Sequence, residues 1–128
     1  MGQRAFPVIY ARDVIRVAEF YGRLGFEEHA RLPEEGDPGF VGLRREDAEL
    51  AIVTVESPRA LIGLDVGTEP RFELFVYVRD VDQEVGELRD AGHAILRDPE
   101  DMEWGERVAY VADPEGNPVA LAMAAVGG

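Results

Sequence analysis

Hydrophobic and polar residues alternate near the start of the chain and then change to a helical spacing. Residues 5–11 place their bulky apolar side chains at alternate positions, which predicts a β-strand. Residues 14–24 carry apolar side chains three or four positions apart, which predicts a helix with one buried face. Asp13 is suited to cap the start of this helix, and Gly25 is suited to end it. The pattern therefore predicts a strand that leads directly into a helix.

The same pattern recurs in the second half of the chain, with almost the same letters at the joint. The joint reads Tyr-Ala-Arg-Asp-Val at 10–14 and Tyr-Val-Arg-Asp-Val at 77–81. An alternating segment at 71–78 precedes the second joint, and a helical pattern capped by Asp80 continues to about residue 91. An internal repeat of this kind predicts two copies of one structural unit.

Each half continues with alternating segments that predict further strands, at 26–32, 40–44 and 49–55 and again at 93–97, 106–111 and 118–123. Two acidic segments, 33–39 and 98–103, are predicted as loops. We therefore expect an α+β fold of two tandem βαβββ modules, about residues 5–56 and 71–124, joined by a linker at 57–70.

Composition limits the class of protein. The 128 residues are 46% hydrophobic, which is enough for one domain with a real core. No apolar run approaches the roughly 18 residues of a membrane span, and no apolar segment of a secretory signal follows the N-terminus. The absence of cysteine excludes disulfides and thiolate zinc sites. A cytoplasmic location is the expectation.

The formal net charge of −13 also excludes a class of partner. Such a chain repels the phosphates of nucleic acids and attracts cations, so we expect no nucleic-acid partner. The lack of a long apolar run likewise predicts no membrane partner. An acidic surface that only maintains solubility remains the alternative.

Three motifs resemble one known group of proteins. They are the paired Arg-Asp-Val joints, Glu-Phe-Tyr at 19–21 followed by Leu-Gly-Phe at 24–26, and Asp-Pro-Glu-Gly-Asn at 113–117. With the doubled βαβββ order, they resemble the vicinal oxygen chelate superfamily, also called the glyoxalase/bleomycin-resistance/dioxygenase superfamily. The resemblance extends over nearly the whole chain.

Within that superfamily the chain is most similar to the bleomycin-resistance proteins, through Pro7-Val8 near the start and Trp104-Gly105 before the last turn. This similarity implies a cavity between curved sheets and a homodimer, in which the N-terminal strand marked by Pro7 is swapped between subunits. An unswapped edge strand is the alternative, because proline cannot donate to a strand ladder.

The enzymes of the superfamily hold one metal through four strand positions. The resemblance places these positions at Phe6, near Ile52, at Glu73 and at Ala120. Three of the four lack a donor atom, and the nearest carboxylate to the second is Glu49, at the start of its strand. One carboxylate cannot form a four-point site, so we expect neither metal nor other cofactor.

Aromatic residues are the first candidates for ligand contact. Trp104 is the only tryptophan and lies in a polar, acidic segment, where an indole can stack on a planar ring or a cation. The resemblance also places Phe40 and Phe75 in a drug-binding groove. The alternatives are a tryptophan packed on its own domain and ordinary core packing for Phe75.

Acidic residues are the second group of candidates. If Glu73 points into the cavity beside Phe75 and Tyr77, a ligand ammonium or guanidinium could pair with it. The alternatives are a pair with Arg71 or Arg107, or an exposed strand end. Glu34 and Glu35 correspond to acidic and aromatic groove positions, with a solvated loop as the alternative. Phe6 is expected to fill the vacated metal position.

The residues thus favour a metal-independent protein that sequesters a bulky, cationic, planar drug-like ligand, for which bleomycin-type antibiotics are the implied example. An enzyme is the alternative, with Glu73 as a general base or with a metal held by Glu73, Glu49 and a histidine. His29 and His93 fall on no family ligand position. A structural or regulatory dimer with a vestigial cavity is the third hypothesis.

Overall fold

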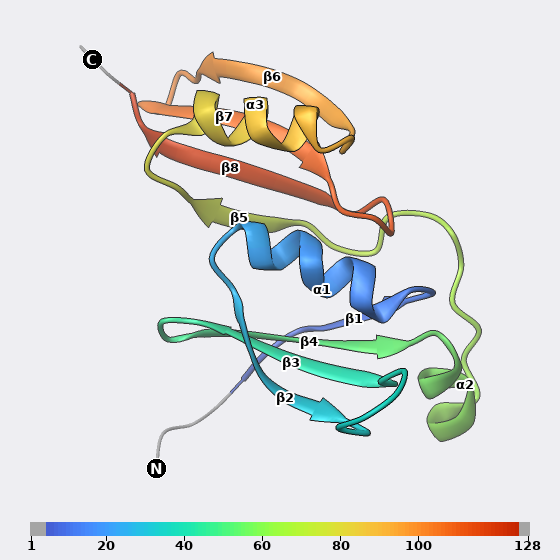
Figure 1. Ribbon diagram of the computed structural model, residues 1–128. Coiled ribbons are helices and arrows are strands. Elements are labelled where there is room, and N and C mark those ends of the chain that lie inside the picture. Colours follow the sequence, from blue (N-terminus) through green and yellow to red (C-terminus); the bar gives the residue numbers. More distant parts are fainter. Residues whose placement is uncertain (1–4, 126–128) are drawn as a thin grey trace. The chain divides into compact units, whose positions relative to one another are not determined.

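The computed structural model describes residues 5–125 and divides into two compact units between Gly67 and Thr68. Each unit contains its own four-stranded sheet and its own long helix (Figure 1). Within the described residues, no helix has the length and apolar character needed to cross a membrane.

The first unit has the order strand, helix and three strands, followed by a short helix. Its elements are β1 (Val8–Ala11), α1 (Val14–Arg23), β2 (Glu27–Leu32), β3 (Phe40–Arg45), β4 (Ala48–Thr54) and α2 (Glu56–Ile62). The sheet order is β1-β4-β3-β2, with β1 parallel to β4 and the other neighbours antiparallel. β1 is therefore an edge strand, and Pro7 immediately precedes it.

The second unit repeats this arrangement. Its elements are β5 (Leu74–Tyr77), α3 (Val81–Asp90), β6 (Ile95–Asp101), β7 (Glu106–Ala112) and β8 (Pro118–Ala124). The sheet order is β5-β8-β7-β6, again with a single parallel pair, β5 with β8. The predicted α+β fold of two tandem βαβββ modules is confirmed.

The repeated Arg-Asp-Val joint forms the same cap in both units. The side chain of Asp13 accepts a hydrogen bond from the backbone N–H of Arg16 at 3.1 Å, and that of Asp80 accepts one from Gln83 at 3.1 Å. Each bond satisfies a backbone donor that a helix start leaves without an intrahelical partner. At the other end of the two helices, the residues after the C-caps are Gly25 and Gly92, whose positive φ angles of 94° and 91° favour glycine.

The sheet of the second unit has one face toward α3 and one face away from it. The backbone N–H of Val81 lies 3.4 Å from the sulfur of Met123, and Arg107 reaches Asp82 on α3. Met123 and Arg107 therefore point toward the helix. Because side chains alternate along a strand, their neighbours Glu106 and Ala122 point to the opposite face.

Two segments differ from the prediction. The acidic segment 98–103 was predicted as a loop, but β6 continues through it to Asp101. Arg97 binds Glu100 and Arg107 binds Asp101, which neutralises the carboxylates, and a register shift between Arg97 and Glu100 accommodates Pro99. The helix α2 was also not predicted. It begins within the proline-containing segment and ends at Gly63, whose φ is 69°.

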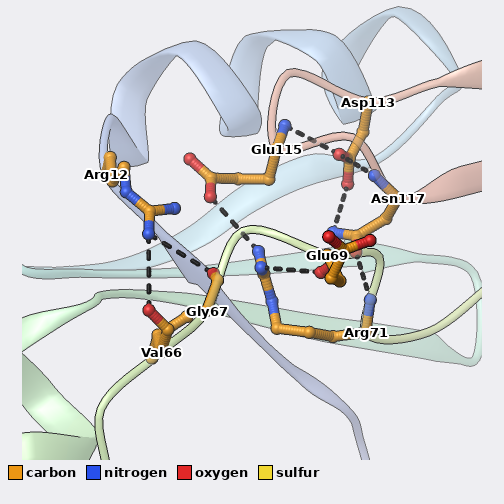
Figure 2. A network of polar contacts seen from close by, with 8 residues as sticks. All are labelled: Arg12, Val66, Gly67, Glu69, Arg71, Asp113, Glu115 and Asn117. Atoms are coloured by element: carbon orange, nitrogen blue, oxygen red, sulfur yellow. Dashed lines mark hydrogen bonds and ion pairs between the residues drawn. The ribbon is translucent and has the colours of Figure 1, made fainter.

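The Asp-Pro-Glu-Gly-Asn segment forms a buried polar turn in the second unit (Figure 2). Asp113 is 3% exposed and Asn117 is 1% exposed. The carboxylate of Asp113 accepts hydrogen bonds from the backbone N–H groups of Glu115 and Asn117 and from the Asn117 amide, at 2.8–3.0 Å. The side-chain amide oxygen of Asn117 accepts one from the backbone N–H of Arg71 at 3.0 Å. The turn thus holds the segment that leads into β5.

Candidate functional site

Aromatic side chains gather on the face of the second sheet that points away from α3. Phe75 and Tyr77, on β5, stack with their ring centroids 5.8 Å apart and their planes 13° apart. Their side chains are 42% and 54% exposed. Their partners on β8 are Ala120 and Ala122, which are both fully buried.

The carboxylate of Glu106 joins Tyr77 to Trp104. Its Oε2 accepts a hydrogen bond from the Tyr77 hydroxyl at 2.6 Å, and its Oε1 accepts one from the Trp104 indole N–H at 2.9 Å. The bond to Glu106 raises the pKa of the Tyr77 phenol above its ordinary value, because the carboxylate stabilises the protonated phenol. We call Phe75, Tyr77, Trp104 and Glu106 the aromatic–carboxylate cluster.

A tight turn between β6 and β7 places the indole beside this carboxylate. The Met102 N–H donates to the Glu106 carbonyl at 2.7 Å, and the Gly105 N–H donates to the Met102 carbonyl at 3.1 Å. Gly105 has a φ of 95°, which only glycine adopts without strain. The turn leaves Trp104 57% exposed.

Among residues 5–125, no basic side chain pairs with the carboxylate of Glu106. In the described part of the chain, its hydrogen bonds come only from the neutral Tyr77 and Trp104. The adjacent Arg107 points to the opposite face, where its guanidinium binds Asp82 at 2.7 and 2.9 Å and Asp101 at 3.0 Å. The cluster therefore presents a half-buried carboxylate flanked by aromatic rings.

The structure brings together two of the predicted ligand residues, Phe75 and Trp104, through Tyr77 and Glu106. The predicted shared face of Phe75 and Tyr77 is confirmed. Glu73 precedes β5 rather than lying within it, and it is exposed.

The partners suggested for Glu73 have other contacts. The Arg71 guanidinium donates to Glu115 and to the Glu69 carbonyl, both at 3.2 Å, while Arg107 binds Asp82 and Asp101. Within residues 5–125 the exposed Glu73 carboxylate makes no hydrogen bond or ion pair. Glu73 therefore lies at an exposed strand end, which was one of the two alternatives to a position in the cavity.

Four predicted residues belong to the first unit. Phe40 begins β3 and is half-buried opposite Val53, while Phe6 precedes β1 and is 39% exposed. Glu34 and Glu35 are exposed in the loop after β2. Together with Glu28, His29, Ala30 and Arg31, Glu34 lines a shallow polar hollow of about 330 Å³.

Strand register identifies the counterpart of Ala120 in the first unit. Val8 pairs with Ala51 on β4 as Phe75 pairs with Ala120 on β8, so the equivalent position is Ala51, one residue before Ile52. Alanine offers no donor atom there. Across residues 5–125, no three histidine, aspartate or glutamate side chains lie close enough to hold a metal ion.

Glu49 lies two residues before Ala51 on β4, and therefore on the same face of the first sheet. Its Oε1 is 3.8 Å from the Nε2 of His29, with 13% and 30% of these side chains exposed. His29 also borders a polar hollow of about 460 Å³, lined further by Gly25, Glu27, Glu28, Arg44, Arg45 and Glu46. The hollow lacks aromatic walls, unlike the face that carries the cluster.

Sequence reasoning missed Glu106 and gave no role to Tyr77. The alternation Glu106, Val108 and Tyr110 along β7 was a signal that these side chains share one face. The contact with Tyr77 had no comparable signal, because it depends on how β5 and β7 both pair with β8.

Residues 5–121 match the family model described as the Glyoxalase/Bleomycin resistance protein/Dioxygenase superfamily. Comparison with curated proteins gave no significant match. Among solved structures, TioX from Micromonospora sp. ML1 is 22% identical, with a TM-score of 0.79, over 97% of this chain and 100% of its own.

Two further solved structures have names that indicate an activity. A glyoxalase-related enzyme from Fulvimarina pelagi is 25% identical, with a TM-score of 0.74, over 95% of this chain and 88% of its own. A bleomycin-binding protein complexed with bleomycin is 25% identical, with a TM-score of 0.62, over 97% of this chain and 100% of its own.

Proposed function

Because the chain belongs to the glyoxalase/bleomycin resistance protein/dioxygenase superfamily, we propose that it binds a bulky small molecule with planar rings and positive charge. The binding sequesters the ligand without chemical change. A bleomycin-type antibiotic is the first candidate, since one structural neighbour is named as a bleomycin-binding protein.

The aromatic–carboxylate cluster is the observation that carries this proposal. Stacking of a ligand ring on an aromatic side chain adds about 0.5–1.5 kcal/mol beyond the burial of its area. A cation above the indole adds roughly 0.5–2 kcal/mol. The exposed rings of Phe75, Tyr77 and Trp104 provide such surfaces, and Glu106 adds negative charge beside them. The net charge of −13 favours the approach of cations from a distance.

The test uses metal-free bleomycin and the single tryptophan. Saturating bleomycin should change the fluorescence of Trp104 and raise the melting temperature, since about a hundredfold excess over Kd stabilises the folded state by about 2.7 kcal/mol. Trp104→Ala should weaken binding. Leu61→Ala, which removes an apolar side chain that is 79% exposed on α2, should leave binding unchanged. The proposal fails for this ligand class if neither fluorescence nor melting temperature responds.

Catalysis is the second candidate function. The observation that favours it is the exposed Glu73 carboxylate, which makes no hydrogen bond or ion pair within residues 5–125 and is therefore accessible to a substrate as a general base. A glyoxalase-related enzyme is also among the structural neighbours. Glu73→Gln should then abolish turnover of a superfamily substrate. Binding without turnover by the unaltered protein would instead support sequestration.

We also propose that the protein acts as a homodimer, with its edge strand β1 as the candidate for exchange between subunits. The position of Pro7 just before this edge strand supports the proposal, because the missing N–H interrupts strand pairing there. Sedimentation equilibrium measures the mass directly, and a monomer at all concentrations would contradict the dimer.

A further inference from the structure

The hydrogen bonds at Glu106 leave it with unused acceptor capacity. A carboxylate offers about four lone-pair sites, two on each oxygen. The Tyr77 hydroxyl uses one site on Oε2, and the Trp104 indole N–H uses one site on Oε1. Counting donors within residues 5–125, about one site remains on each oxygen. The direction of the side chain is held by two partners, one on β5 and one in the turn between β6 and β7.

The two neutral donors fix the carboxylate without reducing its formal charge. Both hydrogen bonds orient Glu106 before a ligand arrives, so little side-chain freedom remains to be lost on binding. The negative charge stays available, since Arg107 is held on the other face by Asp82 and Asp101. Such a group is prepared for a cation that carries its own N–H donors.

The presence of a remaining acceptor site on each oxygen, together with the aromatic side chains beside them, distinguishes among cations. An amidinium or guanidinium group presents two parallel N–H donors that match both oxygens of a carboxylate, and its flat face can stack on an aromatic ring. A primary ammonium is a compact, strongly hydrated charge. A quaternary ammonium interacts with rings but has no N–H to donate.

Resting on the proposed binding function, we infer that Glu106 determines specificity for ligands in which a planar ring carries an amidinium or guanidinium group. The ring stacks beside Trp104 and Tyr77, while the flat cation donates two hydrogen bonds to the carboxylate. A neutral amide lacks the positive charge and the second nitrogen donor, and a quaternary ammonium has no N–H. Analogues of the same ring that carry these groups therefore bind more weakly.

The experiment uses three probes that share one ring system: 2-naphthamidine, the neutral 2-naphthamide and trimethyl(2-naphthyl)ammonium. Calorimetry measures their affinities for the full chain. The indole N–H resonance of Trp104, the only tryptophan, reports directly on the bond to Glu106 in ¹H–¹⁵N spectra. We expect 2-naphthamidine to bind most tightly and to shift this resonance.

Two matched variants separate the local contact from the general charge. Glu106→Gln keeps the size of the side chain and should lower the affinity for 2-naphthamidine by roughly tenfold, with the affinity for 2-naphthamide almost unchanged. Glu103→Gln removes the same charge from an exposed residue of the same turn and should leave both affinities unchanged.

Three results would overturn the inference. Equal losses in Glu106→Gln and Glu103→Gln would assign the effect to net charge. Equal losses for the amidine and the amide in Glu106→Gln would show that Glu106 only positions Trp104. Binding of bleomycin without binding of 2-naphthamidine would also overturn it, while the proposed sequestration would stand. If bleomycin does not bind but 2-naphthamidine still binds more tightly than 2-naphthamide, the inference about Glu106 stands and the proposed sequestration of bleomycin is wrong.

Discussion

Removal of the Asn117 side-chain amide tests how strongly the buried turn of the second unit holds the start of β5. Asn117→Ala deletes two hydrogen bonds, one to the Asp113 carboxylate and one from the backbone N–H of Arg71, both 3.0 Å long. The site is almost inaccessible to water, since Asn117 is 1% exposed and Asp113 is 3% exposed. Water therefore cannot easily replace the lost partners.

The magnitude follows from these contacts. Each deleted hydrogen bond contributes about 1 kcal/mol net, and the N–H that loses its acceptor adds a desolvation penalty of roughly 1 kcal/mol or more. Asp113 retains its two backbone donors, from Glu115 and residue 117, so the turn itself persists. We expect the free energy of unfolding to fall by about 2–4 kcal/mol.

Urea unfolding followed by circular dichroism measures this loss. Gln83→Ala is the matched control, because it removes an exposed amide of α3 that donates to Glu87, and it should change stability by less than about 0.5 kcal/mol. Hydrogen exchange of the Arg71 amide provides a local measurement. The reasoning is refuted if Asn117→Ala is no less stable than Gln83→Ala, or if the Arg71 amide keeps its protection.

Three further predictions concern pH and backbone conformation. The raised pKa of Tyr77 should appear in the difference between absorbance titrations of the unaltered protein and Tyr77→Phe. The stability that the Tyr77–Glu106 bond contributes is present below the ordinary tyrosine pKa of about 10, and it is lost as the pH rises through the pKa of Tyr77 in the folded protein. Hydrogen bonds from Arg107 lower the pKa of Asp82. The stability contributed by this pair is therefore present above the usual aspartate pKa of 3.8, and it is lost as the pH falls through the pKa of Asp82 in the folded protein. An Asp82→Asn variant with the same acid unfolding curve as the unaltered protein would contradict this. Gly105→Ala should lower stability by roughly 1–2 kcal/mol because of its φ of 95°, whereas Gly86→Ala, in the interior of α3, should raise it by up to about 1 kcal/mol; thermal unfolding decides whether the two changes have opposite signs.

The fold could be predicted largely from local patterns. The Arg-Asp-Val joints predict both helix starts because the capping aspartate and the backbone N–H it satisfies lie three residues apart. The continuation of β6 through 98–101 could not be predicted in this way. Two of its carboxylates, Asp98 and Asp101, bind Arg89 on α3 and Arg107 on β7, and these pairs form only when the helix and the next strand pack beside β6.

The sequence by itself determined which chemical groups are available. It supplies phenylalanine at position 6, glutamate at position 73, alanine at position 120 and one tryptophan beside an acidic turn. The tertiary structure alone decided which groups meet. Tyr77 and Glu106 are 29 residues apart and lie on strands that do not pair with each other, so their contact depends on the register of both strands against β8. That register is set by packing across the whole sheet, because a shift of one residue would turn every side chain of a strand to the other face.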